Sequence, residues 1–378
     1  MSTTRPEQQA YVNRIARALR QNPLLGLLAA VPAVFIAERT SPESHTTLFV
    51  LAVLAIVPLA ALLSHATESV AAKTGDAVGG LLNATLGNLT ELVITITALR
   101  AGMFDLVKAS IAGVIVTNSL FMLGMALLLG GLKYRVQEYN PGSARLQAGM
   151  LFLAAVALLV PSVIGASGRP GAQAMVDQLS IGLAVLLLVA YVLGLVFSLG
   201  THREFFEGKS PAGGHDDDEH LWPMGVALAT LAVVTVTVAL VSEIFVESVQ
   251  VAAETLGMTP AFVGFIVVAA VGAAAEMTAA FAAARKNRLD LSVGIALGSS
   301  SQVAMFVAPV LVLLSLFIAP HPMDLQFWPG AVAMVLISTV TVFLVANGGR
   351  SAWYLGVMLL VVYATFAMTL YLLPPTGR

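Results

Sequence analysis

The feature that most constrains this chain is a succession of apolar stretches, each long enough to cross a lipid bilayer as a helix. A spanning helix needs about 20 mostly apolar residues. About eleven stretches approach or exceed this length, near 23–38, 46–65, 77–99, 107–130, 147–166, 177–199, 224–245, 259–284, 291–318, 327–346 and 352–373. They are continuous and rich in Ala, Leu and Val, whereas the strands of a membrane barrel alternate. The pattern predicts an all-α, polytopic membrane protein.

The composition agrees with this prediction and excludes other classes of protein. Hydrophobic residues make up 58% of the 378 residues and charged residues only 11%, against about 25% charged in soluble domains. The formal net charge of -2 gives no basic field for phosphates, so we expect the lipid bilayer and no nucleic acid as a partner. The chain has no cysteine, which excludes disulfides, thiol catalysis and Cys-ligated metals.

The distribution of Lys and Arg sets the expected orientation, because short cytoplasmic loops are enriched in them. With a cytoplasmic N-terminus, fourteen of the 19 basic residues fall in cytoplasmic segments and five in external ones. The reverse orientation would violate the rule. The termini are short, so we expect a multi-pass protein of a prokaryotic cytoplasmic membrane with its N-terminus inside; an organellar membrane is the alternative.

The longest polar insert, residues 200–221, divides the chain into halves. Six apolar stretches precede it and five follow. Without the first stretch each half has five, and an odd number places the halves in opposite orientations, as in inverted-repeat transporters. The expected organisation is a cytoplasmic segment with the first helix (1–45), a first five-helix repeat (46–199), an acidic cytoplasmic loop (200–221) and a second five-helix repeat (222–378).

The two halves share an internal repeat at one ungapped offset, the repeat offset, which carries Gly87 onto Gly272. The same offset carries Glu91 onto Glu276. Five further identities follow, which are Arg100 with Arg285, Asp105 with Asp290, Leu106 with Leu291, Gly113 with Gly298 and Phe121 with Phe306. We expect each copy to contain a helix with a mid-membrane Gly-x-x-x-Glu, a short charged turn and a second, Gly-containing helix.

The repeated glutamates are the candidate transport site, because an unpaired carboxylate in hydrocarbon costs about 2.5–3.5 kcal/mol or more. Neither has a basic residue within four positions on its helix. Asn88 lies one helical turn from Glu91, and the partner helices add Asn118, Ser300 and Gln302. Such an oxygen-only set suits hard cations such as Ca²⁺.

Two carboxylates also suit exchange, because Glu91 and Glu276 can hold one divalent metal ion or two protons but not both. This competition couples the two fluxes if access alternates. The alternative is that the carboxylates are buried polar contacts between helices. Interhelical hydrogen bonding accounts for Asn88, Asn118 and Gln302 as well as cation contact does.

Three stretches resemble the cation/proton exchangers of the calcium/cation antiporter superfamily. GGLLNATLGNLTELVITITAL (79–99) is similar to the first repeat motif of that family, KASIAGVIVTNSLFMLGMALLLGG (108–131) to its continuation, and KNRLDLSVGIALGSSSQVAMFVAP (286–309) to the continuation of the second. The resemblance implies a secondary antiporter that exchanges Ca²⁺ for H⁺, with Glu91 and Glu276 as the shared site. Both ions are substrates, and no cofactor is expected.

The second repeat departs from the family motif, which usually reads Gly-Asn-Ala-Ala-Glu-His. Here Ala273 replaces the Asn and Met277 the His. The loss of an amide oxygen weakens a hard-cation site or changes its selectivity. Exchange of Na⁺ or Mn²⁺ is therefore an alternative to Ca²⁺, and a cation channel is the other rival, since a channel can share an acidic pore.

The acidic run Asp216, Asp217, Asp218 and Glu219 lies in the polar insert. The resemblance suggests a regulatory, cation-attracting segment, and a plain solvated loop is the alternative. A membrane prenyltransferase that holds Mg²⁺-diphosphate on Asp-rich motifs is a remote third class, because such chemistry needs two motifs and one is present. We therefore expect a transporter and no enzyme. The sequence leaves open whether the chain forms a homo-oligomer.

Overall fold

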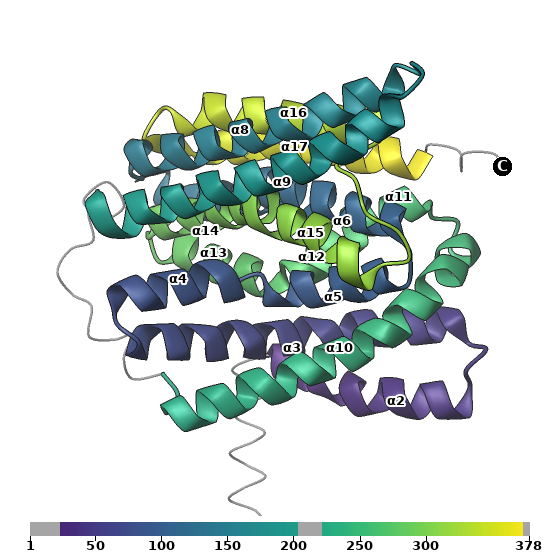
Figure 1. Ribbon diagram of the computed structural model, residues 1–378. Helices are drawn as coiled ribbons and strands as arrows, with labels where there is room; N and C mark the ends of the chain where they lie inside the picture. Colours follow the sequence, from purple (N-terminus) through teal and green to yellow (C-terminus); the bar gives the residue numbers. More distant parts are fainter. Residues whose placement is uncertain (1–22, 203–220, 373–378) are drawn as a thin grey trace, which may run out of the picture.

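The computed structural model describes residues 23–202 and 221–372, which are helical almost throughout (Figure 1). The elements of the first half are η1 (Pro23–Ala29), α2 (Ala30–Thr40), α3 (His45–Lys73), α4 (Asp76–Leu86), α5 (Leu89–Arg100), α6 (Phe104–Val116), η2 (Thr117–Met122), α7 (Leu123–Tyr134), β1 (Val136–Glu138), α8 (Pro141–Ala166), α9 (Ala172–Val196) and η3 (Phe197–Thr201). Those of the second half are α10 (Met224–Thr255), α11 (Pro260–Phe262), η6 (Val263–Val268), α12 (Ala269–Gly272), α13 (Ala274–Arg285), α14 (Leu289–Gln302), η7 (Val303–Val307), α15 (Ala308–Ile318), α16 (Pro329–Ala346), β2 (Arg350–Ala352) and α17 (Trp353–Leu372). η1 is a 3-10 helix, and the other η segments are π-helices.

The membrane-length helices follow the predicted stretches. Eight helices in the described residues are long and apolar enough to cross a membrane, or ten if each of two bent helix pairs is one span. The stretch predicted at 291–318, for example, is the run Leu289–Ile318. The first predicted span differs, because residues 23–40 form a 3-10 helix followed by a helix of 11 residues. The helical membrane fold is confirmed, whereas the count of eleven spans is not.

The helices that carry the repeated glutamates are broken, although the sequence predicted one continuous helix in each repeat. α4 and α5 bend by 42°, and the run from α11 to α12 bends by 59° against α13. The breaks fall after Leu86 and after Gly272, so Asn88 and Ala273, which the repeat offset pairs, both stand at a break. In Figure 1 the chain runs from left to right through α4 and α5 but from right to left through α12 and α13. The two bent pairs are thus inverted with respect to each other.

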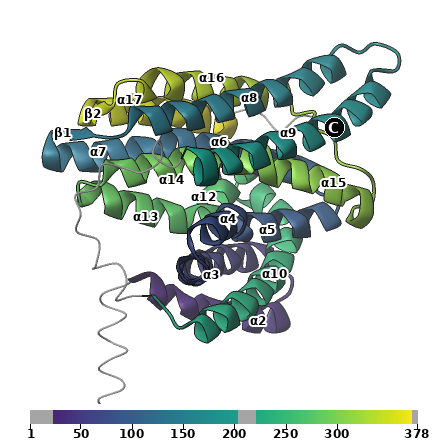
Figure 2. The same ribbon diagram turned by 60° about the vertical axis from the view of Figure 1, so that its left-hand side comes forward.

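The bent pairs lie in the middle of the molecule. α3, α10 and α2 pack together on one side of them, and α8, α9, α16 and α17 lie on the other (Figures 1 and 2). Within this middle layer α6 crosses η6 closely. A Cβ atom added to Gly113 would lie 2.5 Å from the Cα atom of Phe265, so glycine is required for this crossing.

Two turns, the one between α5 and α6 and the one between α13 and α14, contact a segment from the other half of the chain. The turn between α13 and α14 is bound by Gln137, whose Nε2 donates to the carbonyl oxygen of Ala284 (3.0 Å) and to Oδ1 of Asn287 (2.9 Å). After the turn between α5 and α6, the ring of Phe104, the first residue of α6, stacks on His321 of the segment between α15 and α16, with centroids 4.2 Å apart. Each half of the chain therefore contacts the other near one of these two turns.

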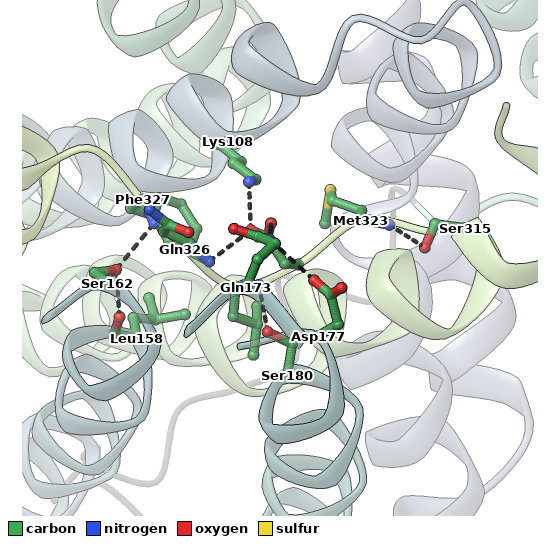
Figure 3. A network of polar contacts seen from close by, with 12 residues as sticks. Lys108, Leu158, Ser162, Gln173, Asp177, Ser180, Ser315, Met323, Gln326 and Phe327 are labelled. Carbon is green, nitrogen blue, oxygen red and sulfur yellow. Dashed lines mark hydrogen bonds and ion pairs between the residues drawn. The ribbon is translucent and has the colours of Figure 1, made fainter. Parts of the chain in front are cut away.

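The segment between α15 and α16 is fixed by backbone hydrogen bonds and an ion pair (Figure 3). Three of its N–H groups donate to serine hydroxyls at 2.8–2.9 Å, those of Met323 to Ser315, Leu325 to Ser180 and Phe327 to Ser162. Oδ1 of Asp324 lies 2.5 Å from Nζ of Lys108 on α6, and the two side chains are 18% and 15% exposed. Oδ2 of Asp324 accepts from Gln173 on α9 (3.3 Å).

We expect the ion pair of Lys108 and Asp324 to stabilise the fold measurably. Replacing either partner (Lys108→Met or Asp324→Asn) should lower the free energy of unfolding by about 1–3 kcal/mol, because the other charge is left partly buried without its partner. The double variant should lose less than the sum of the single losses. Thermal unfolding of the detergent-solubilised protein measures this double-mutant cycle.

The ion pair of Arg350 and Glu138 is the matched control. Its atoms approach to 2.7 Å, but the side chains are 73% and 69% exposed. Water screens this pair, so its coupling energy should stay below about 1 kcal/mol. Equal coupling energies for the two pairs would contradict the importance of burial.

Candidate cation site at the helix breaks

Glu91 and Glu276 occupy the same position in the two bent pairs. Each is the third residue of the helix that follows a break, in α5 and α13 respectively. The N-terminus of a helix carries partial positive charge, which favours a carboxylate there, and the last carbonyl oxygens of the preceding helix lack the donors that a continuous helix would supply. Each break therefore places an acidic side chain in the first turn of a helix that starts inside the bundle, an arrangement like that of discontinuous transporter helices.

The breaks of the two pairs meet. A Cβ atom added to Gly272, the last residue of α12, would lie 2.9 Å from Cγ and 3.4 Å from Oε1 of Glu91. Glu276 lies four residues beyond Gly272. Glu91 is buried and Glu276 half-buried. Gly272, one helical turn before Glu276, therefore lies against the side chain of Glu91, and a shared site of the two carboxylates stays a prediction.

Three of the four carboxylate oxygens lack a hydrogen-bond donor among the described residues. Both oxygens of Glu91, Oε2 of Glu276 and Oδ1 of Asn118 are buried with no hydrogen-bond partner among the described residues. A buried oxygen without a partner costs free energy, and more so when it is charged. A bound proton or cation would supply the partner that these oxygens lack.

Asn88, Asn118 and Gln302 form one chain of hydrogen bonds across the two halves. Nδ2 of Asn88 donates to Oε1 of Gln302 (2.6 Å), and Oδ1 of Asn88 accepts from the hydroxyl of Ser299 (3.0 Å). Nδ2 of Asn118 donates to the same hydroxyl (3.0 Å). The amide of Asn88 is therefore engaged in interhelical bonds, whereas Oδ1 of Asn118 is free to bind a ligand.

Ser300 makes a different contact from its neighbour Ser299. Its hydroxyl lies 3.1 Å from that of Ser119 and donates to the carbonyl oxygen of Ala296 (2.8 Å). In this structure Ser300 joins α14 to η2 and does not belong to the chain of amides. The predicted regulatory residues Asp216, Asp217, Asp218 and Glu219 lie outside the described residues.

A small cavity adjoins Glu91. Its volume is about 10 Å³, close to the minimum for one water molecule. Apart from Glu91, its polar side chains are Thr95 and Ser110, and the remaining walls come from apolar residues of α5, α6, η6 and η7 and from Gly272. Among the described residues no three His, Cys, Asp or Glu side chains gather as a metal site. A divalent cation here would depend on two carboxylates with amide, hydroxyl, backbone or water oxygens.

Sequence reasoning did not select Ser299, Ser110 or Gly272 as site residues. Ser299 and its two neighbours form a run of serines whose orientation depends on the exact rotation of α14. Ser110 lies on a helix face that only the packing of α6 against η6 directs toward Glu91. For Gly272 a signal existed, since the repeat offset pairs it with Gly87.

Comparison with known proteins now places this geometry in a family. The family described as sodium/calcium exchanger protein matches residues 44–200 and 226–372. The chain belongs to this family. It is therefore a member of a family of membrane cation exchangers, in agreement with the apolar helices.

Individual relatives cover nearly the whole chain. A Ca²⁺/H⁺ antiporter of Synechocystis sp. is 41% identical over 366 residues, 93% of this chain and 97% of its own. The Ca²⁺/H⁺ antiporter ChaA of Bacillus subtilis is 40% identical over 328 residues, 86% of this chain and 92% of its own. The solved structure of native YfkE superposes with a TM-score of 0.79 at 35% identity, covering 93% of this chain and all of YfkE. The H⁺/Ca²⁺ exchanger CAX shares the fold with a TM-score of 0.69 at 16% identity, over 94% of this chain and 89% of CAX.

Proposed function

We propose that this family member is a secondary antiporter that exchanges Ca²⁺ for H⁺ across a prokaryotic cytoplasmic membrane. The observation that carries the proposal is the pair of glutamates with unpartnered oxygens where the two breaks meet. Relatives at 40–41% identity with the names of Ca²⁺/H⁺ antiporters support the choice of ions. We place the N-terminus in the cytoplasm, because this orientation satisfies the distribution of Lys and Arg.

In this proposal Ca²⁺ and protons compete for Glu91 and Glu276. When the cation is bound, both carboxylates are ionised and act as ligands, with Oδ1 of Asn118 and the backbone carbonyls of the breaks as further oxygens. When the cation leaves, protons neutralise the carboxylates, because two unpaired charges in this buried place would be costly. Asn88 and Gln302 hold the two halves in register, and Ser300 supports the same contact.

Coupling requires that access alternates between the two sides of the membrane. The inverted halves, 46–199 and 222–378, supply two equivalent arrangements of the same elements, which is the basis of alternating access in repeat transporters. Such a movement would break and re-form the contacts between the halves at these turns, those of Gln137 with Ala284 and Asn287 and of Phe104 with His321. A channel would conduct without breaking these contacts, because it does not need alternating access.

Transport by the purified protein in liposomes tests the function. Vesicles with an acidic interior and an interior pH dye should take up external Ca²⁺ while the interior becomes more alkaline. Dissipating the pH gradient electroneutrally, with nigericin and equal K⁺ on both sides, should abolish the uptake. Uptake that follows an imposed voltage without proton movement would instead establish a channel. Parallel measurements with Mn²⁺ and Na⁺ determine whether Ala273 and Met277 have changed the selectivity.

We also propose that the acidic run Asp216, Asp217, Asp218 and Glu219 modulates transport. Trp222 contacts α3 in two ways: its ring stacks on His65 with centroids 4.4 Å apart, and its backbone N–H donates to the hydroxyl of Ser69 (3.2 Å). Trp222, three residues after the run in the sequence, therefore contacts a helix that packs on both bent pairs.

Neutralising the four acidic residues together should change the apparent affinity for Ca²⁺ severalfold and leave coupled exchange intact. The reason is that a cluster of like charges raises the local cation concentration without taking part in the exchange step. The salt dependence of Ca²⁺ uptake checks this, since the difference from the wild type should shrink at high ionic strength. Complete loss of transport in a folded variant would place the run in the exchange mechanism itself.

A further inference from the structure

The break between α4 and α5 leaves backbone oxygens to be satisfied. The last four carbonyl groups of a helix have no amide donor within that helix. α4 ends at Leu86, so the carbonyl oxygen of Ala84 is one of these four. Ala84 is buried, and a buried carbonyl group without a donor is costly inside a membrane.

Tyr191 on α9 satisfies this oxygen. Its hydroxyl donates to the carbonyl oxygen of Ala84 at 2.8 Å, from a side chain that is 3% exposed. The ring of Tyr191 lies against that of Phe306 in η7, with centroids 5.5 Å apart. The hydroxyl is therefore held in place by a neighbouring ring from the second half of the chain.

The second bent pair solves the same problem without a side chain. Ala269 is the residue that the repeat offset pairs with Ala84, and its carbonyl oxygen accepts from the backbone N–H of Ala273 at 3.1 Å. The hydroxyl of Tyr191 thus occupies the role that a backbone amide fills in the other pair. The two breaks therefore differ. The first, with a bend of 42°, depends on a contact from outside the bent pair, whereas the second, with a bend of 59°, does not depend on one for this oxygen.

We propose that Tyr191 is a positioning residue for exchange, which holds the break of α4 and α5 at the angle that directs Glu91 into the site and keeps Asn88 in its interhelical hydrogen bonds. This inference rests on the proposed function, because it concerns the same two-glutamate site. Asn88 and Glu91 are the N-cap and third residue of α5, so a change in the angle between α4 and α5 moves both. Loss of the hydroxyl should weaken cation binding more than it slows the maximal rate.

The variant Tyr191→Phe tests the inference, because it keeps the ring against Phe306 and removes only the donor. In the liposome assay we expect the apparent Km for Ca²⁺ to rise about tenfold, equivalent to ~1.4 kcal/mol, while the maximal exchange rate falls less than twofold. Incorporation of 4-aminophenylalanine at position 191, whose amino group can donate to the same oxygen, should restore the Km.

Tyr139→Phe is the matched control. Tyr139 is 6% exposed, and its hydroxyl donates to the carbonyl oxygen of Val345 at 3.1 Å, in the last turn of α16 and away from the breaks. It should leave the Km for Ca²⁺ unchanged while costing similar thermal stability. A rise in Km in both variants would overturn the inference, because the effect would then not be specific to the break.

Three further outcomes test the positioning role of Tyr191 and separate it from the proposed function. An unchanged Km for folded Tyr191→Phe overturns the positioning role while leaving the proposed exchange intact. If Tyr191→Phe does not fold, Phe306→Leu takes its place, since it loosens the support of the hydroxyl; an unchanged Km there also overturns the role. Absence of Ca²⁺/H⁺ exchange in the wild-type protein refutes the proposed function instead, and the Km comparison is then made with whichever cation the wild type exchanges.

Discussion

Replacing Glu91 or Glu276 by Gln is expected to reduce exchange more than about 100-fold in each variant, the largest effect that we expect of a single substitution. A loss of this size equals about 2.7 kcal/mol, well within the contribution of one charged ligand to a buried site. Glutamine keeps the shape of the side chain but can neither release a proton nor neutralise a cation. Ca²⁺-dependent alkalinisation inside liposomes measures the loss.

The same variants should remain folded and lose only their response to the cation. A neutral amide costs less to bury than an unpaired carboxylate, so their melting temperatures without Ca²⁺ should equal or exceed that of the wild type. Ca²⁺ should raise the melting temperature of the wild type and not that of the variants, because only binding to the native state stabilises it. Glu254→Gln, at an exposed position in the last turn of α10, is the control and should behave as the wild type. Full exchange by either site variant would refute the two-glutamate site.

Gly272→Ala should impair binding while retaining both glutamates. The added Cβ atom would lie 2.9 Å from Cγ of Glu91 and 3.4 Å from its carboxyl carbon, so the side chain of Glu91 must move. We expect the apparent affinity for Ca²⁺ to fall about tenfold or more, equivalent to ~1.4 kcal/mol. The thermal stability should change little, because alanine is favoured over glycine in a helix by about 1 kcal/mol and this offsets the crowding.

The matched control for this substitution is Gly294→Ala in α14. No atom lies within 4 Å of a Cβ atom added to Gly294. The control should therefore keep its affinity for Ca²⁺ and gain slightly in stability. If Gly272→Ala binds Ca²⁺ as tightly as this control, the contact between Gly272 and Glu91 does not shape the site.

The positions of the membrane helices could be predicted from hydropathy, because a span is a long local signal that needs no knowledge of its neighbours. The stretch predicted at 107–130 lies within the helical run Phe104–Tyr134. The first stretch, 23–38, was predicted less well. It is short, and residues 23–29 form a 3-10 helix, whose tighter winding hydropathy does not report.

The sequence by itself determined the pair of glutamates and their equivalence. A carboxylate without a basic neighbour in an apolar stretch is costly wherever the helix lies, and the repeat offset that pairs Glu91 with Glu276 is visible in the printed chain. Only the tertiary structure decided that the helices break before these two residues. A break exposes backbone oxygens, and whether it is tolerated depends on donors from distant elements, such as the hydroxyl of Tyr191 on Ala84. The same holds for Asn88 and Gln302, which are 214 residues apart: their side chains could be recognised as polar, but their bond exists because two inverted halves pack with their breaks in contact.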